Sequence, residues 1–137
     1  MKVVIDTNVI VSGLLSPYGH SAQILQLIIT GKIDICYDAR ILVEFYEVLD
    51  RPKFKFKKEH VSVLLREIKL IGESSPSFPL PQSLPDPDDD MFLEIALTCN
   101  ADCIITGNVK HFPKKLCLGV KVFTPAAFIH YFRERRI

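Results

Sequence analysis

The sequence predicts an α/β fold with a central, mostly parallel sheet covered by helices on both faces. Short apolar segments alternate with segments whose apolar residues recur at helical spacing, and this alternation is typical of a parallel sheet connected by helices. Of the 137 residues, 48% are hydrophobic. This is enough apolar material for one core, so we expect residues 1–137 to form a single domain.

The first elements are predicted from a β-branched run and two changes of periodicity. Residues 3–5 (Val-Val-Ile) form a short apolar run, which predicts a strand buried on both faces. Residues 16–19 (Ser-Pro-Tyr-Gly) indicate a loop, after which apolar residues recur at helical spacing from Ile24 up to Gly31, a plausible helix stop. Residues 33–36 alternate between apolar and polar side chains and predict a second strand.

Two helices and an extended connector follow. The first helix begins after Asp38, a candidate N-cap, and ends before Pro52, because proline disfavours helix at the residue that precedes it. The second runs from about Lys58 to Ile71, where apolar residues share one face. Residues 74–87 are rich in proline, and we expect an extended connector there rather than a domain boundary.

The C-terminal part is predicted to add two strands and two helices. A helix opens in the acidic run that ends at Asp90 and continues through Leu97. Residues 103–105 and 120–123 are short apolar segments that predict strands. Thr124 and the proline after it suit the start of a last helix, since proline is favoured at the first helical position.

Composition excludes several classes of protein. The formal net charge of +1 argues against a strongly basic nucleic-acid coat, so any nucleic-acid binding must use local patches. No apolar run is long enough to span a bilayer, and an aspartate at position 6 interrupts the apolar core that a signal peptide would need. The four cysteines show no metal-ligand spacing, and we expect buried, reduced thiols in a cytoplasmic protein.

Polar residues follow two of the predicted strands directly. Asp6 comes after the first strand, and Thr106 and Asn108 come after the strand at 103–105. In a parallel sheet the carboxyl ends of the strands meet at one edge, where ligands of open α/β proteins bind. We therefore expect these side chains to converge, although an Asp-Thr-Asn sequence and an asparagine after glycine also suit simple turns.

The most distinctive local signal is acidic. Residues 86–90 (Asp-Pro-Asp-Asp-Asp) hold four carboxylates in five positions. Such carboxylates repel one another unless helix N-termini or cations compensate. A helix cap and an acidic first turn explain part of the run, and a hard divalent cation held by oxygen ligands would neutralise the rest.

Glu44 is the other carboxylate of interest, because it borders the apolar stripe of its predicted helix rather than the solvated face. A carboxylate that leans toward a core needs a partner. Either a salt bridge to a neighbour such as Arg40 or a site shared with Asp6 would supply that partner, and an exposed position is the remaining alternative.

Four segments, taken in order, resemble the PIN-domain family. They are Val-Ile-Asp-Thr-Asn-Val at 4–9, Glu44, Asp-Pro-Asp-Asp-Asp-Met-Phe-Leu at 86–93, and Ala-Asp-Cys-Ile-Ile-Thr-Gly-Asn at 101–108. The resemblance covers nearly the whole chain. Arg-Pro-Lys-Phe at 51–54 is similar to a subgroup of prokaryotic PIN proteins that are regarded as toxins of toxin–antitoxin systems.

The resemblance implies a three-layer α/β/α sandwich and a Mg²⁺- or Mn²⁺-dependent ribonuclease. It further implies RNA as substrate, a homodimer, and a cognate antitoxin that blocks the site, for example by inserting a basic side chain among the carboxylates. By position, Asp6 matches the first acid of the family, Glu44 the second and Asp90 the third, with Asp88 and Asp89 as further candidates.

Asn108 departs from the family pattern, because many PIN domains have an aspartate there. We expect Asp6 and Asp90 to hold the metal ion directly, and Glu44 to bind it through water or to deprotonate the attacking water. The missing acid argues against tight binding of a second ion, and Asn108 would orient water or phosphate.

Five side chains are expected to contact the substrate: Thr7, Asn8, Thr106, Lys53 and Lys55. The two lysines lie in a segment where basic residues alternate with Phe54 and Phe56, a combination that suits single-stranded nucleic acid. The same segment is also compatible with two phenylalanines packed against the core among solvated lysines.

Three other functions stay open at this point. A catalytically degenerate PIN-like module would bind RNA or a protein partner without cleaving, and Asn108 motivates that reading. A metal-dependent phosphohydrolase would use the same carboxylates on small phosphoesters. A structure-specific DNA nuclease would perform the same phosphodiester chemistry on another nucleic acid.

Overall fold

The computed structural model describes residues 1–74 and 76–135. Within them the chain forms a five-stranded sheet in the order β3-β2-β1-β4-β5, and every neighbouring pair is parallel. The first strand is therefore at the centre of the sheet, flanked by two strands that follow it far along the chain. The bounds are Lys2–Ile5 (β1), Asp34–Tyr37 (β2), Glu73–Ser74 (β3), Cys103–Ile105 (β4) and Lys121–Phe123 (β5).

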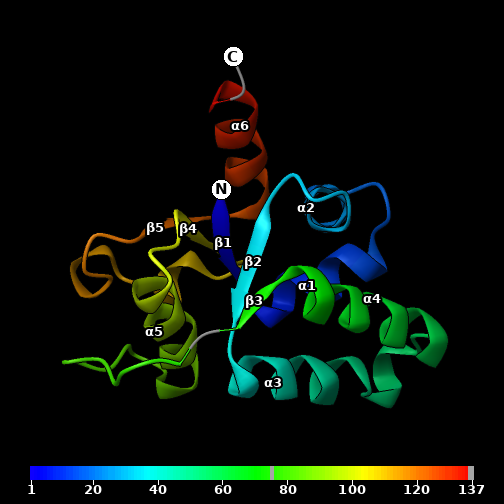
Figure 1. Cartoon of the computed structure of the whole chain (residues 1–137), viewed down its shortest axis with the longest axis horizontal. Helices are drawn as coiled ribbons and strands as arrows, with labels where there is room; N and C mark the ends of the chain where they lie inside the picture. Colours follow the sequence, from blue (N-terminus) through cyan, green and yellow to red (C-terminus); the bar gives the residue numbers. More distant parts are fainter. Residues whose placement is uncertain (75, 136–137) are drawn as a thin grey trace.

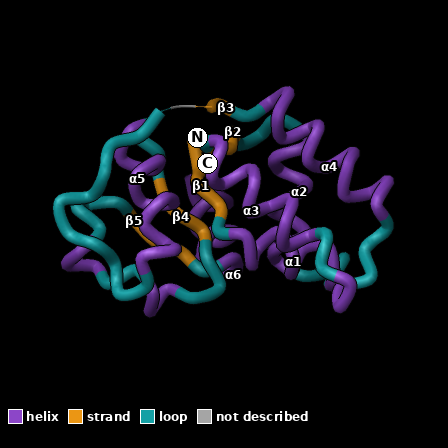
Figure 2. The backbone as a smooth tube through the Cα atoms, turned by 90° about the horizontal axis from the view of Figure 1, so that it is seen from below, coloured by secondary structure: helices purple, strands orange, loops and turns teal. Residues whose placement is uncertain are grey.

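Helices cover both sides of this sheet. In Figure 1, α5 lies on one side of the strands, whereas α1, α2 and α4 lie on the other with α3 below them, and Figure 2 shows the same separation from beneath. The predicted α/β class with a parallel sheet is confirmed. The bounds are Thr7–Leu15 (α1), His20–Ile29 (α2), Ala39–Leu49 (α3), Lys58–Ile71 (α4), Asp90–Thr98 (α5) and Pro125–Arg135 (α6).

Two elements were not predicted. Helix α1 begins immediately after β1, at Thr7 and Asn8. These two residue types favour caps and turns over helix interiors, so the sequence also suited a turn here. The helix forms because α2 packs closely against it and buries Val9, Ile10 and Gly13. Strand β3 is only two residues long and carries no readable pattern. Residue 75, in the predicted connector, lies outside the described residues.

The acidic run starts α5 later than expected. Residues Pro87–Asp89 form a 3₁₀ turn, in which the Asp86 side chain accepts a hydrogen bond from the backbone N–H of Asp88 at 3.0 Å. The α-helix itself begins at Asp90. A 3₁₀ turn has fewer residues per turn than an α-helix, so it changes the directions in which the consecutive aspartates point.

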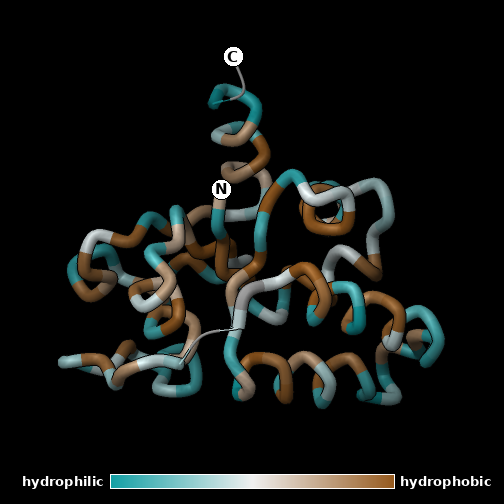
Figure 3. The backbone as a smooth tube through the Cα atoms, in the orientation of Figure 1, coloured by the Kyte–Doolittle hydropathy of each residue, from teal (hydrophilic) through white to brown (hydrophobic). Residues whose placement is uncertain are grey.

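The core lies between the sheet and the helices on each side. Figure 3 shows hydrophobic residues along the strands and recurring on the helices, with hydrophilic residues between them. The cysteines are buried and free, as expected, and burial raises the pKa of the Cys103 thiol to about 12. The largest fully buried side chains include Phe45, Phe92 and Phe128. In the described part of the chain, no helix has both the length and the apolar character needed to cross a membrane.

The register of the sheet determines what lies at its carboxyl edge. Val3 pairs with Cys103 and Ile5 pairs with Ile105, so β1 and β4 end level with each other. The backbone N–H of Asp6 then donates to the Ile105 carbonyl at 3.0 Å. The residues that follow the two strands, Asp6 and Thr106, are therefore held next to each other at the sheet edge.

Replacing Phe45 by alanine should lower the free energy of unfolding by about 3–5 kcal/mol, because its ring is fully buried and the cavity cannot close completely. Tyr46, its neighbour on α3, is 42% exposed and is the matched control, for which we expect a loss below about 1 kcal/mol. Urea unfolding of both variants measures the difference. Equal losses would show that the α3 face has been assigned wrongly.

Candidate functional site

Asp6 occupies the centre of the carboxyl edge. Its side chain is 8% exposed, and Oδ2 accepts hydrogen bonds from the Thr106 hydroxyl at 2.8 Å and the Asn8 amide at 3.3 Å. Burial raises the pKa of this carboxyl, while the hydrogen bond from Thr106 and the nearby backbone N–H groups oppose that rise. Asp6 is thus a desolvated carboxylate whose orientation is fixed by its neighbours.

Glu44 reaches the same region from α3. The Thr7 hydroxyl donates a hydrogen bond to Glu44 Oε2, which connects the glutamate to the first turn of α1. Partial burial raises the pKa of Glu44, and the negative charges of Asp6 and Asp88 raise it further, against the opposing effects of Thr7 and Arg51. Because Thr7 directly follows Asp6, its hydrogen bond places Glu44 in the same region of the sheet edge as Asp6.

Asp89 is the third carboxylate beside Asp6. Burial raises its pKa to about 6, and the charges of Asp6 and Asp86 contribute to the rise. Its Oδ2 atom is buried and, within the described residues, accepts no hydrogen bond. That atom lies 3.3 Å from Nδ1 of His111, which forms an ion pair with it when the imidazole is protonated.

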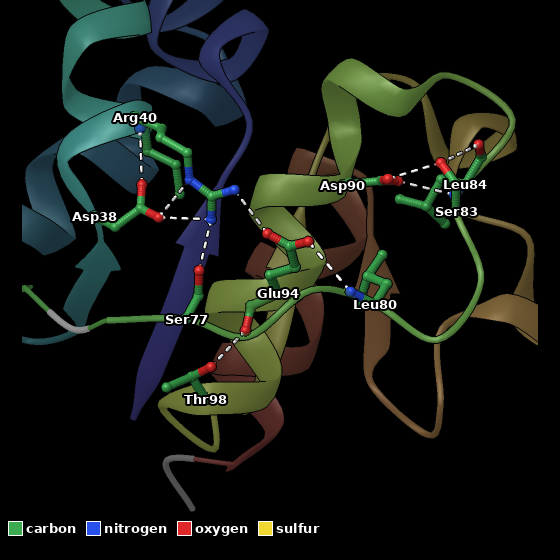
Figure 4. Close-up of polar contacts among 10 residues, drawn as sticks. Asp38, Arg40, Ser77, Leu80, Ser83, Leu84, Asp90, Glu94 and Thr98 are labelled. Carbon is green, nitrogen blue, oxygen red and sulfur yellow. Dashed lines mark hydrogen bonds and ion pairs between the residues drawn. The ribbon is translucent and has the colours of Figure 1, made fainter.

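The Asp90 carboxylate, expected as a metal ligand, is engaged by a loop in this structure. One carboxylate oxygen of Asp90 accepts the Ser83 hydroxyl at 2.7 Å, and the other accepts the backbone N–H of Leu84 at 2.8 Å. Figure 4 shows this side chain directed at the 83–84 loop. Asp90 anchors the end of the proline-rich connector to α5, and the preceding residue, Asp89, is the one that lies near Asp6.

Arg40 is committed elsewhere, so it is not the partner of Glu44. Its guanidinium contacts Asp38 at the start of α3 and Glu94 on α5, each at 2.7 Å, and it also donates to the Ser77 hydroxyl at 2.7 Å (Figure 4). Asp38 and Glu94 are both buried. These contacts connect α3 to α5, and therefore hold the helix that carries Glu44 against the helix that follows Asp89.

The loop after β4 supports Asp6 rather than offering free groups to a ligand. The Thr106 hydroxyl donates to Asp6 and accepts the backbone N–H of Asn108 at 3.0 Å, while the N–H of Gly107 donates to the Asn8 side chain at 3.1 Å. Thr106 is 0% exposed and Thr7 is 5% exposed. Both hydroxyls are thus buried against carboxylates, and their contact with substrate stays a prediction.

The donor set at this edge fits a hard divalent cation. Asp6, Glu44 and Asp89 offer carboxylate oxygens, which such ions prefer, and the buried Oδ2 of Asp89 accepts no hydrogen bond among the described residues, its contact there being the His111 imidazole at 3.3 Å. The same residues contain no group of three acidic, histidine or cysteine side chains already close enough to enclose an ion. Small side-chain rotations would therefore have to accompany binding.

The segment with Lys53 and Lys55 follows α3 and is exposed. Phe54 and Phe56 stack on each other with ring centroids 5.4 Å apart, and the Lys53 ammonium lies 5.1 Å from the Phe54 ring. Both rings are half-buried. Phe56 packs against the core as well as on Phe54, and the two lysines are exposed beside the rings.

The sequence placed His111 near the proposed site but favoured a surface-loop histidine, and it favoured Asp90 over Asp89. In the structure His111 is half-exposed, and its Nδ1 lies 3.3 Å from Asp89 Oδ2. Its position in a loop after a strand that ends in polar residues was the available signal. Asp89 lies in a run of consecutive aspartates, and the sequence contains no pattern that shows which of them lies near Asp6.

Comparison with known proteins gives two matches. A family model described as PIN domain matches residues 2–110. The uncharacterized protein MJ1680 of Methanocaldococcus jannaschii is 29% identical over 147 aligned residues, which cover 98% of this chain and 93% of that protein. The family match includes all of the carboxylates described above and the loop through Lys110.

Replacing Asp89 by asparagine should stabilise the metal-free protein at pH about 7.5. A carboxyl whose pKa rises from 3.8 to about 6 on folding binds its proton more tightly in the fold, so its contribution to stability falls as the pH rises through that interval. Asparagine cannot ionise, so the variant does not lose stability as the pH rises through that interval. Thermal unfolding in a chelating buffer should show the advantage of the variant shrinking as the pH is lowered to about 4.

The control for that measurement is Asp34→Asn, which removes the same charge from an exposed position at the start of β2. It should leave the pH dependence of unfolding close to that of the unmodified protein. If both variants change the pH profile alike, the effect comes from net charge, and Asp89 is not in a desolvated site.

Proposed function

The chain belongs to the PIN-domain family, and from that premise we propose that it is a Mg²⁺- or Mn²⁺-dependent endoribonuclease that hydrolyses phosphodiester bonds in single-stranded RNA. PIN domains are generally nucleases and typically bind divalent metals. The observation that carries the proposal for this chain is the gathering of Asp6, Glu44 and Asp89 at the carboxyl edge of a parallel sheet, where the buried Oδ2 of Asp89 accepts no hydrogen bond within the described residues and has His111 Nδ1 at 3.3 Å as an ionic contact.

In this proposal Asp6 and Asp89 hold the metal ion. The Asp6 oxygen that accepts Thr106 and Asn8 is fixed in direction, which leaves its other oxygen for the ion. Asp89 replaces Asp90 in the ligand set, because Asp90 is bound to Ser83 and Leu84. A divalent ion bound here would lower the pKa of a bound water and stabilise charge on the phosphate oxygens.

Glu44 is the residue that we assign to the attacking water. Its Oε2 accepts the Thr7 hydroxyl, so Oε1 is the oxygen that would accept a proton from water. The raised pKa of Glu44 brings this carboxyl closer to the range in which a general base is effective at neutral pH. His111 and Asn108 border the site from the loop after β4, and they would orient phosphate or water.

The proposed biological role is that of a toxin controlled by a cognate antitoxin, with a homodimer as the working form. The support for this part is the resemblance of residues 51–54 and 107–113 to the toxin subgroup of PIN proteins. The reduced, buried cysteines are compatible with a cytoplasmic setting.

A non-catalytic RNA-binding module is the second candidate. The observation that favours it is Asn108, a neutral side chain at the position where many PIN domains carry an aspartate. Such a module would retain the lysines at 53 and 55 and would bind RNA without cleaving it.

Cleavage of a labelled single-stranded RNA in Mg²⁺ or Mn²⁺ tests the proposed site. Asp6→Asn and Asp89→Asn should each reduce the rate at least about 100-fold, because each removes a charge that holds the ion. Asp90→Asn is the matched control from the adjacent position, and it should stay within about threefold of the unmodified protein, since its carboxylate serves the 83–84 loop.

Calorimetric titration with Mn²⁺ distinguishes the remaining outcomes. Loss of ion binding in Asp6→Asn together with loss of cleavage supports the assignment, whereas undiminished cleavage in that variant would falsify it. Loss in Asp90→Asn and not in Asp89→Asn would restore the sequence-based choice of Asp90. RNA binding without cleavage by the unmodified protein would select the non-catalytic module.

Substrate contact by the 53–55 segment predicts a weaker salt dependence when its charges are removed. A Lys53→Gln, Lys55→Gln double variant should bind single-stranded RNA less tightly, and the slope of log affinity against log salt should fall by about 1.4, since each lost phosphate contact contributes about 0.7. The control is Lys32→Gln with Lys69→Gln, two exposed lysines that precede β2 and β3 and so lie toward the opposite edge of the sheet. Equal slopes for the two double variants would remove the 53–55 segment from the RNA path.

A further inference from the structure

A groove next to the outer strand of the sheet has no role in the proposed nuclease. It has a volume of about 770 Å³ and lies between β5 and the loop that carries residues 109–114. Val109, Pro113, Val120 and Val122 contribute aliphatic surface to it. The groove is therefore concave and lined in part by aliphatic side chains, as ligand sites commonly are.

Strand β5 presents a free edge to this groove. In the described sheet β5 pairs with β4 alone, and the carbonyl of Phe123 accepts the N–H of Thr106 on that side. Backbone groups of consecutive strand residues point to opposite sides, so the N–H and C=O of Val122 point away from β4. An extended chain laid along this edge would satisfy both groups.

The charges around the groove have one sign. Lys110, Lys114 and Lys121 are exposed at its rim, and none of its lining residues is acidic. The ammonium of Lys121 lies 5.3 Å from the Tyr131 ring, which holds it beside the groove. A ligand that fits is therefore anionic on one side and apolar on the other.

The lining favours a peptide over a nucleic acid. Bases bind single-stranded sites by stacking on aromatic faces. The two aromatic residues here are Phe112, which is 3% exposed, and Phe123, which packs against Tyr131 with ring centroids 4.7 Å apart. Aliphatic side chains and a free strand edge instead match a peptide whose side chains alternate between two faces.

We propose that this groove binds an extended segment of a partner protein in which acidic and apolar residues alternate, and that the segment adds a strand to the free edge of β5. The apolar side chains lie against Val120 and Val122, and the carboxylates pair with Lys110, Lys114 and Lys121. The site is separate from the carboxylates around Asp6, so the proposal holds whether or not the protein cleaves RNA.

The test uses the whole protein and a fluorescent peptide of alternating valine and glutamate. We expect saturable binding that weakens between about 50 and about 300 mM NaCl, because the rim charges are exposed and screened. Lys114→Glu should weaken binding about tenfold, whereas Lys115→Glu, its exposed neighbour outside the groove lining, should leave binding within about twofold.

The strand-addition geometry has its own control. Val122→Pro removes the outward N–H and is tolerated on an edge strand, whereas Val122→Ala keeps that N–H. Only the proline variant should lose the greater part of the affinity. In the unmodified protein, amide NMR shifts at residues 120–123 should move on binding while those of Asp6 and Glu44 stay unchanged, a readout that does not depend on the variants folding.

Three results would overturn the proposal. One is that the valine–glutamate peptide binds no more tightly than a valine–lysine peptide of equal length. Another is that Lys114→Glu and Lys115→Glu behave alike. The third is that a single-stranded RNA, and not the peptide, shifts the 120–123 amides, which would make the groove a nucleic-acid site. Lysines that serve only to keep the β5 edge from aggregating would give the first result.

Discussion

The parallel pairing of β1 with β4 is the constraint on which the rest of the structure depends. It places the first strand of the chain at the centre of the sheet, and its register ends both strands at the same level. Asp6 and Thr106 then meet in a buried hydrogen bond of 2.8 Å. The position of Asp6 sets where Glu44 and Asp89 must arrive, because both approach it from helical segments packed on the sheet.

Bringing these carboxylates together opposes folding. Burial raises the pKa values of Asp6, Glu44 and Asp89, and the negative charge of Asp6 raises those of the other two further, which means that the ionised forms are less stable here than in water. The apolar core compensates for this cost, and the Arg40 contacts between α3 and α5 keep the two helices from separating. A cluster of carboxyl groups with raised pKa values is typical of sites that act on a ligand.

Periodicity in the sequence was sufficient for the fold class and for most elements, since buried strands and amphipathic helices have repeating patterns. Periodicity did not predict α1, because Thr7 and Asn8 have weak helix preference and tertiary packing determines that this segment is helical. The candidate site was predicted at Asp6 and Glu44, whereas Asp89 was only a further candidate after Asp90. Consecutive helical residues point about 100° apart, so a single 3₁₀ turn before Asp90 decides which aspartate faces the sheet. Only three-dimensional structure contains that information.

The hydrogen bond between Thr106 and Asp6 joins residues that are 100 positions apart in the chain. Contacts of such long sequence separation form late and slow the folding of a protein. A ribosome synthesising this chain releases β1 first, yet β1 cannot pair with β4 until residues 103–105 have emerged. The hydrogen bond that fixes the Asp6 carboxylate consequently stays unformed throughout most of translation.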